Sequence, residues 1–349
     1  MSTNSGFDFF VQMHLTERCN LRCKHCYQTG KNVDEMSLSE VKKAIGEIAG
    51  TLNAWKKTYD IDFSPSFNVT GGEPFLRSDL FEILSEMGGR GFDSYLLTNG
   101  ILMDEKKSRD LFSHGVKGVQ VSIEGPEEIH ESIRGKGSFS GSLRGVRILL
   151  DAGLRVTLNV TLSSLNAGSF MDIVELASNL GVHSLGFSRL VPSGRGGAML
   201  NTMLAAEEVK DLYEKIFSLD TGNLRIVTGD PVASQLSIEI GADRGNIPMG
   251  GCAAGVSGLT ILPDGTIVPC RRLYIPIGNI KRDSFREIWS TSQVLEALRD
   301  RSRYSGKCGS CNRWASCRGC RAIAYAFSQA KGENDFLAED PQCFIASAC

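Results

Sequence analysis

Three cysteines near the N-terminus are spaced so that they could hold one metal cluster. Cys19, Cys23 and Cys26 form a C-x3-C-x2-C run just after the apolar stretch Phe9 to Leu15. The stretch predicts a strand, which puts the cysteines in the loop that leaves its carboxyl end. Such a loop can wrap three thiolates around one cubane iron–sulfur cluster, each on a different iron. Ferredoxin-type carriers use four cysteines, so here one iron is left to bind and activate a small molecule.

Two other interpretations of these thiols are open. The cysteines could be unrelated, or they could form part of a zinc site completed by His14 or His25. Three cysteines spaced this closely after a strand favour the iron–sulfur cluster.

The cysteine run resembles the signature of the radical S-adenosylmethionine (radical SAM) superfamily, C-x3-C-x-aromatic-C, with His25 in the aromatic position. A second motif, Gly71, Gly72, Glu73 and Pro74, resembles the GGEP motif of that superfamily. Alone it is a turn signal, but it follows the cysteines by one strand–helix unit, as in the family. The resemblance implies that SAM binds here. Glycine lets main-chain carbonyls approach the SAM ammonium without a Cβ in the way, and Glu73 adds a negative charge nearby.

Four further polar residues resemble family contacts to SAM. Asn99 follows the third predicted strand, near the cofactor. Ser122 and Arg134 resemble the groups that hold the SAM carboxylate, which the fork of an arginine suits. Asn159 resembles a contact to a ribose hydroxyl. The alternative for each is a solvated or capping polar residue.

The C-terminal cysteines resemble those of the SPASM domain, an extension found in radical SAM enzymes that carries two auxiliary 4Fe–4S clusters. The resemblance implies that one set of cysteines holds an outer cluster: Cys308, Cys311, Cys317 and Cys343. It implies that a second set holds an inner cluster nearer the barrel: Cys252, Cys270 and Cys320. The cofactors implied are therefore SAM and three 4Fe–4S clusters, one of them binding SAM.

Two departures from the SPASM pattern bear on these clusters. The usual C-x3-C step is C-x2-C at Cys317 to Cys320, and no cysteine follows shortly after Cys252. The inner cluster could therefore have an open iron, unless Cys349 completes it. Zinc is the alternative for this region, because paired C-x2-C steps are also zinc-ribbon spacing.

Composition limits the class of protein. The chain has 349 residues, 42% of them hydrophobic, and a formal charge of −2. This charge gives no reason to expect nucleic acid or an anionic membrane as a partner. We expect a cytoplasmic protein, because the N-terminus lacks a signal sequence and no apolar run is long enough to span a membrane. Without secretion, the 11 cysteines favour metal over disulfides.

Predicted strands and helices alternate along the first two thirds of the chain. This alternation predicts an α/β fold, a partial (β/α)6 TIM-like barrel, followed by a cysteine-rich SPASM domain. The stretch Asp220 to Ile247 breaks the alternation, so we expect domains at residues 1–235 and 236–349. A β-hairpin with a Pro-Asp-Gly turn is predicted over Leu259 to Val268. Ligands of such barrels collect at the carboxyl ends of the strands.

The family chemistry implies reductive cleavage of SAM to a 5′-deoxyadenosyl radical, which abstracts hydrogen from a substrate. The residues around the first cysteines most resemble enzymes that modify ribosomally made peptides, so a peptide maturase is the first hypothesis. The chain has no room before its first strand for a leader-peptide-binding domain, so a separate protein would bind the leader. The segments Cys317 to Ala322 and Asp335 to Cys343 instead resemble enzymes of haem d1 and alternative haem synthesis, which act on a tetrapyrrole. A flavodoxin- or ferredoxin-like reductant is implied in either case. The hypothesis from a different class is a non-catalytic iron–sulfur electron carrier.

Overall fold

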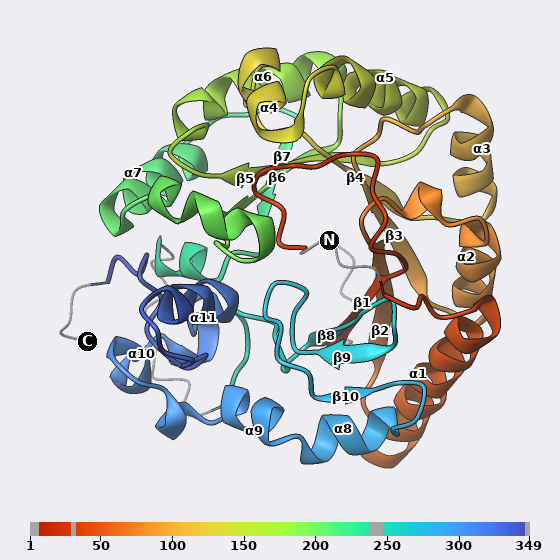
Figure 1. The fold of residues 1–349 in the computed structure, drawn as a ribbon, viewed down its shortest axis with the longest axis vertical. Coiled ribbons are helices and arrows are strands. Elements are labelled where there is room, and N and C mark those ends of the chain that lie inside the picture. The colour runs from red at the N-terminus through yellow and green to blue at the C-terminus, as the bar shows by residue number, and fades with distance from the viewer. Residues whose placement is uncertain (1–6, 29–32, 237–246, 346–349) are drawn as a thin grey trace.

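The computed structural model describes residues 7–28, 33–236 and 247–345. One ten-stranded sheet runs through them in the order β10-β9-β8-β1-β2-β3-β4-β5-β6-β7. The sheet curls into an open barrel with helices around its outside, and the C-terminal region lies beside the open side (Figure 1). The strands are β1 (Phe7–His14), β2 (Phe63–Thr70), β3 (Asp93–Thr98), β4 (Gly118–Ser122), β5 (Val156–Leu162), β6 (Ser184–Arg189), β7 (Arg225–Thr228), β8 (Gly258–Ile261), β9 (Thr266–Val268) and β10 (Gly278–Asn279).

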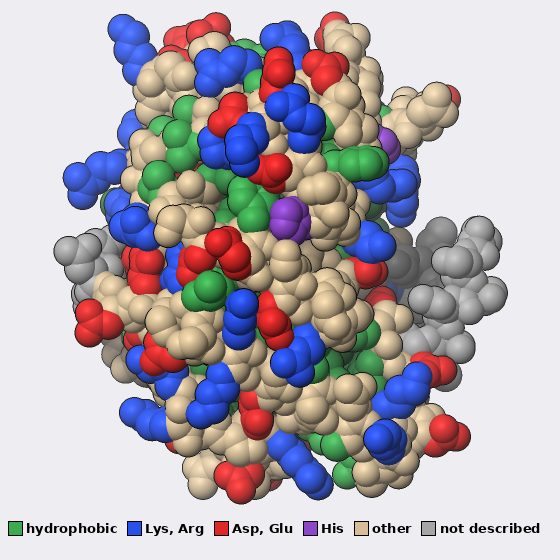
Figure 2. Space-filling view, turned by 90° about the vertical axis from the view of Figure 1, so that its right-hand side faces the viewer, with side chains coloured by type: hydrophobic (Ala, Val, Ile, Leu, Met, Phe, Trp, Pro, Cys, Tyr) green, Lys and Arg blue, Asp and Glu red, His purple; other side chains and the backbone are tan. Residues whose placement is uncertain are grey.

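The helices alternate with the strands as far as β7 and then form the C-terminal region. They are α1 (Leu38–Tyr59), α2 (Leu80–Gly89), α3 (Glu105–Ser113), α4 (Glu127–Arg134), α5 (Ser138–Asp151), α6 (Phe170–Leu180), α7 (Ala206–Phe217), α8 (Phe285–Thr291), α9 (Gln293–Arg299), α10 (Lys307–Ser310) and α11 (Arg321–Ala330). No helix within the described ranges is long and apolar enough to cross a membrane. On the face shown in Figure 2, acidic and basic side chains are interspersed.

The predicted barrel is confirmed, with parallel pairing from β1 through β7. Helix α1 begins at a capping box that the sequence predicts. The Ser37 Oγ accepts a hydrogen bond from the Glu40 N–H, and the Glu40 carboxylate accepts one from the Ser37 N–H at 2.8 Å. This reciprocal pair satisfies two N–H groups that the first turn would otherwise leave free.

The expected break in the strand–helix pattern at Asp220 to Ile247 is wrong in part. Strand β7 lies inside this stretch and continues the parallel sheet beside β6. It has only four residues, and none of them is fully buried. It therefore lacks the apolar run by which a buried strand is recognised. Helices α2 and α4 are likewise absent from the sequence-based prediction.

The predicted C-terminal hairpin is confirmed as β8 and β9, and it extends the sheet of the barrel. Strand β8 pairs in parallel with β1, with Phe10 opposite Gly258 and Met13 opposite Ile261. A Cβ on Gly258 would lie 2.6 Å from the Phe10 carbonyl oxygen, so glycine permits this pairing. The C-terminal region is therefore hydrogen-bonded directly to the first strand of the barrel.

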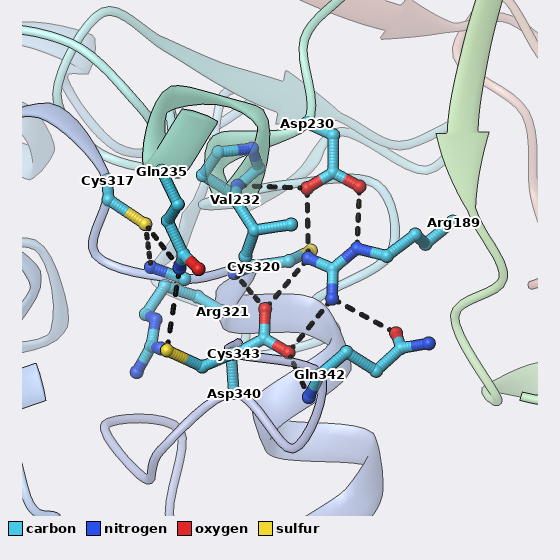
Figure 3. A network of polar contacts seen from close by, with 12 residues as sticks. Arg189, Asp230, Val232, Gln235, Cys317, Cys320, Arg321, Asp340, Gln342 and Cys343 are labelled. Carbon is cyan, nitrogen blue, oxygen red and sulfur yellow. Dashed lines mark hydrogen bonds and ion pairs between the residues drawn. The ribbon is translucent and has the colours of Figure 1, made fainter. Parts of the chain in front are cut away.

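A buried ion network joins the two regions a second time (Figure 3). Arg189 ends β6 and has no exposed side-chain surface. Its Nε lies 2.6 Å from Asp230, which follows β7, and its Nη2 lies 2.8 Å from Asp340 in the C-terminal region. Burial by itself would lower the pKa of Arg189, but the two carboxylates raise it well above its usual value. Arg189 is therefore charged and compensated from both regions.

We predict that Arg189→Met destabilises the protein strongly. The substitution keeps an apolar stem but leaves Asp230 and Asp340 buried without their counter-ion, which typically costs about 3–5 kcal/mol. The free energy of unfolding, measured anaerobically by urea titration, should fall accordingly. The matched control is Arg109→Met, because Arg109 pairs with Glu105 at the surface of α3, where ion pairs contribute little. Similar losses in the two variants would contradict the prediction.

Candidate active site and metal centres

The first three thiols lie at the mouth of the barrel, as the sequence predicts. Cys19, Cys23 and Cys26 line a cavity that contains about 940 Å³ of space not filled by atoms. The wall of this cavity also contains most of the residues that the sequence assigned to SAM, namely His25, Gly71, Gly72, Asn99, Ser122, Arg134 and Asn159. Gly71, Gly72, Asn99 and Ser122 lie at or just after the carboxyl ends of β2, β3 and β4, which parallel pairing brings together, and Arg134 ends α4.

The two glycines allow the loop after β2 to pack against the cysteine loop. A Cβ on Gly72 would lie 2.1 Å from the Arg18 carbonyl oxygen, and one on Gly71 would lie 2.6 Å from the Thr16 carbonyl oxygen. The N–H of Gly72 donates to the Thr16 carbonyl at 2.7 Å, and the N–H of Glu73 donates to the Arg18 carbonyl at 2.8 Å. The glycines are thus required by a close backbone approach as well as by their place in the cavity wall.

Glu73 lies differently from the sequence-based expectation. Its side chain is fully buried, and its carboxylate accepts hydrogen bonds from the Thr98 hydroxyl at 2.8 Å and the Asn99 N–H at 3.0 Å. Burial raises the pKa of Glu73 to about 7, although these hydrogen bonds oppose the shift. Glu73 therefore ties the end of β2 to the end of β3. Pro74 follows it as the first residue of a short 3-10 turn.

Glu124, at the end of β4, is a site residue that the sequence reasoning missed. It is fully buried, and its carboxylate accepts hydrogen bonds from Arg134 at 2.5 and 2.8 Å. His25 Nε2 lies 3.2 Å from the same carboxylate. Burial would raise the pKa of Glu124, but Arg134 and His25 lower it well below its usual range. The only sequence signal was its position at a strand end, which a capping residue could equally occupy.

Glu124 orients Arg134 beside the cysteine loop. The Nη1 of Arg134 lies 3.9 Å from the Cys23 Sγ. The Asn99 side chain donates to the side chain of Asn20, in the same loop, at 2.7 Å. Two residues assigned to SAM therefore also hold the loop in place. Ser122 and Asn159 lie opposite each other in the register of β4 and β5.

The C-terminal thiols fall into the two groups that the SPASM resemblance implies. One cavity is lined by Cys308, Cys311, Cys317 and Cys343. A separate cavity is lined by Cys252, Cys270 and Cys320. Cys349 lies outside the described residues. The described cysteines form no disulfide, and all-thiolate surroundings suit iron–sulfur clusters.

The spacing of these thiols fits clusters better than single ions. Within the described part of the chain, no three His, Cys, Asp or Glu side chains converge closely enough to hold one metal ion. A cubane takes each thiolate on a different iron and so accommodates wider spacing. Each of the three thiol groups lines a cavity of its own, and the residues present therefore fit the clusters that the sequence implies.

A larger cavity adjoins the mouth of the barrel. It contains about 1650 Å³ of unfilled space, and residues of β1, the cysteine loop, the β8–β9 turn and α11 line it. Tyr27, Gln28, Arg271 and Arg272 line both this cavity and the one beside the first cysteines. Arg271 and Arg272 also line the cavity of the inner cysteine group. These two arginines therefore lie where three cavities meet.

Comparisons with known proteins agree with this arrangement. Residues 13–177 match the radical SAM superfamily, and residues 252–321 match SPASM, an iron–sulfur cluster-binding domain. The AdoMet-dependent heme synthase of Methanosarcina barkeri is 30% identical over 355 residues, covering 95% of this chain and 95% of that protein. A mycofactocin maturase of Mycobacterium tuberculosis is 30% identical over 321 residues, covering 89% of this chain and 78% of that protein.

A solved structure, anSMEcpe with bound AdoMet, shares the fold with a TM-score of 0.73. It is 21% identical to this chain and covers 96% of it, and the match spans 94% of that structure. With the thiol-lined barrel mouth, these matches show that the chain belongs to the radical SAM superfamily. Within that superfamily it is one of the enzymes that carry a C-terminal SPASM domain, for which SAM and 4Fe–4S clusters are the implied cofactors.

We predict that Gly72→Ala severely impairs SAM cleavage. The added Cβ would displace the Arg18 backbone and with it the cysteine loop, and misplacement of reacting groups by about 1 Å can lower a rate about 100-fold. The measurement is 5′-deoxyadenosine released under dithionite, together with iron content. Gly50→Ala is the matched control, because nothing lies within 4 Å of a Cβ at that position in α1. Cleavage by Gly72→Ala at the rate of the unmodified enzyme would show that the close approach is unimportant.

Proposed function

We propose that this enzyme uses SAM to abstract hydrogen from a carboxylated tetrapyrrole, such as a haem precursor. The observation that carries the proposal is the pair Arg271 and Arg272 at the boundary between the barrel mouth and the large cavity. The sequence motifs alone favour a peptide as substrate. The identity to heme synthases over nearly the whole length of both proteins supports the tetrapyrrole instead.

The two arginines form a cationic boundary suited to carboxylates. Both side chains are partly buried, and within the described residues neither makes an ion pair with Asp or Glu. Burial lowers the pKa of Arg271, and the neighbouring Arg272 lowers it further. A substrate carboxylate would relieve this repulsion, and an arginine fork binds a carboxylate through two parallel hydrogen bonds.

Two acidic residues, Glu17 and Asp264, line the large cavity, but neither lines the cavity beside the first cysteines. Burial and the neighbouring Asp264 carboxylate raise the pKa of Glu17 to about 6. A substrate carboxylate is therefore favoured next to the arginines, on the side where the SAM site lies.

The remaining walls suit a large, flat ligand. Tyr27, Tyr274 and Tyr325 contribute aromatic surface. His14 is buried beside Tyr27, with its Nε2 at 3.2 Å from the tyrosine hydroxyl, and burial lowers the pKa of His14 to about 3. The imidazole is therefore neutral at this wall. The cavity is larger than the one beside the first cysteines, which leaves room for a substrate next to SAM.

The chemistry divides between cofactors and protein. When bound, SAM and the N-terminal cluster supply a 5′-deoxyadenosyl radical. The protein orients SAM with Arg134, Ser122 and Asn159 at the mouth of the barrel. Arg271 and Arg272 would fix the tetrapyrrole so that one of its side chains faces the radical. A flavodoxin- or ferredoxin-like protein would supply the electron, and we place one SAM-binding and two auxiliary clusters in the chain.

Incubation with a defined tetrapyrrole tests the proposal. Reconstituted enzyme, SAM and dithionite are combined with iron coproporphyrin III or with sirohaem, and the masses of the tetrapyrrole and of 5′-deoxyadenosine are followed. We expect at least one of the two tetrapyrroles to change mass in proportion to 5′-deoxyadenosine. SAM cleavage without any change in either tetrapyrrole would contradict the proposal.

A peptide substrate is the second candidate, because the mycofactocin maturase is as similar in identity as the heme synthase, although over less of its own length. A cysteine-containing precursor peptide, offered with a separate leader-binding protein, would then be modified where the tetrapyrroles are not.

We predict that Arg271→Gln weakens tetrapyrrole binding and leaves substrate-free SAM cleavage intact. Loss of a hydrogen bond to a charged group typically costs about 1.5–3 kcal/mol, which is about a tenfold or larger rise in the dissociation constant. Binding can be followed by the Soret absorption during titration with iron coproporphyrin III. Arg282→Gln is the control, because Arg282 lies exposed beside Asp283. Equal affinity of both variants for iron coproporphyrin III would show that Arg271 does not bind the substrate.

A further inference from the structure

Gln235 reaches from the barrel into the outer thiol group. It belongs to the 3-10 segment Pro231–Leu236 that follows β7, and its side chain is buried. The Nε2 of Gln235 lies 3.5 Å from the Cys317 Sγ and 3.4 Å from the Cys343 Sγ. Figure 3 shows the amide pointing between these two sulfurs.

The orientation of the amide follows from its other contact. The backbone N–H of Phe344 donates to the Oε1 of Gln235 at 3.3 Å. A backbone N–H can only donate, so the atom facing Phe344 must be the oxygen. The NH₂ group therefore faces the sulfurs, and its two hydrogens match the two thiolates.

The segment that carries Gln235 is held at both of its ends. The Asp230 carboxylate accepts from the Val232 N–H at 3.2 Å and also binds Arg189. The carbonyl of Ser234 accepts a hydrogen bond from the Arg313 side chain at 2.9 Å, next to the outer cysteines. The amide is thus positioned by the fold rather than by the thiols alone.

We propose that Gln235 tunes the outer auxiliary cluster by donating hydrogen bonds to two of its thiolate ligands. Adding an electron to a cluster increases the negative charge on its sulfurs, and hydrogen bonds to those sulfurs stabilise the reduced form. Gln235 therefore raises the reduction potential of this cluster and makes it the better electron acceptor. The inference depends on the outer cluster but not on the identity of the substrate.

Redox titration of the loaded enzyme tests the role of Gln235. The Cys19→Ala background removes the N-terminal cluster, so that electron paramagnetic resonance follows the auxiliary clusters alone. In Gln235→Leu, which keeps the volume but has no donor, we expect the equilibrium constant for reduction of one auxiliary cluster to fall about tenfold. This corresponds to a midpoint about 59 mV lower for a one-electron couple. The other auxiliary cluster should keep its midpoint.

Two further variants keep the test decisive. Gln342→Leu makes the same chemical change in the same buried network, but the Gln342 side chain contacts Arg189 and the Leu204 carbonyl instead of a sulfur. It should leave both midpoints unchanged. Gln235→Glu keeps the shape and places a carboxylate beside the thiolates, so it should also lower the midpoint, and it replaces Gln235→Leu if that variant loads no outer cluster. Unchanged midpoints in the Gln235 variants, or an equal shift in Gln342→Leu, would overturn the proposal.

Discussion

The pairing of β1 on both of its edges is the constraint on which the rest of the structure depends. One edge is hydrogen-bonded to β2, which leads into Gly71 and Gly72, and the other to β8 of the C-terminal region. The strand itself leads into the first cysteine loop. Because parallel strands in register end at the same edge of a sheet, this pairing brings the cysteine loop and the SAM motif together. It also fixes the C-terminal region beside them.

Each thiol group lies beside a buried arginine. Arg134 lies 3.9 Å from Cys23, and Arg321 lies 3.8 Å from Cys308. The thiolates of Cys320 and Cys270 raise the pKa of Arg272 against the effect of burial. Negative charge is costly to bury without a partner, so these cations help to hold anionic clusters inside the protein. Burial raises the pKa of Cys19 and of Cys317 to about 11, so these thiolates in particular need a compensating charge.

The barrel and the SPASM domain are separate in the order of the chain, but side-chain contacts cross the boundary between them. Arg189 and Gln235 both precede the expected boundary at residue 236, yet Arg189 pairs with Asp340 and Gln235 contacts Cys343 in the C-terminal region. The network in Figure 3 therefore links the end of the barrel to the outer thiols. Arg271 and Arg272 make the reverse connection, from the C-terminal region to the mouth of the barrel.

The sequence predicted those features that depend on residues close together in the chain. Three thiols within one loop must end up close together, and a hydrophobic run bounded by turn signals is a strand wherever it lies. The barrel class, most of its strands and the α1 capping box could therefore be predicted. The grouping of the C-terminal cysteines came from the resemblance to the SPASM domain. Strand β7 was missed because it is short and only partly buried. Glu124 was missed because a single acidic residue at a strand end has no distinctive local pattern.

Only the tertiary structure decided which distant residues meet. Glu73 accepts a hydrogen bond from Thr98, and Glu124 pairs with Arg134 and His25. Arg271 and Arg272 lie where three cavities meet. All of these contacts depend on how the crossovers place successive strands. A charge buried at one strand end must find its partner on another strand, and sequence spacing does not encode that distance. The sequence by itself indicated the family and the kind of cofactor, because the cysteine and glycine motifs depend on residue type and local spacing. The fold decided the electrostatic surroundings, because burial and long-range pairing set them.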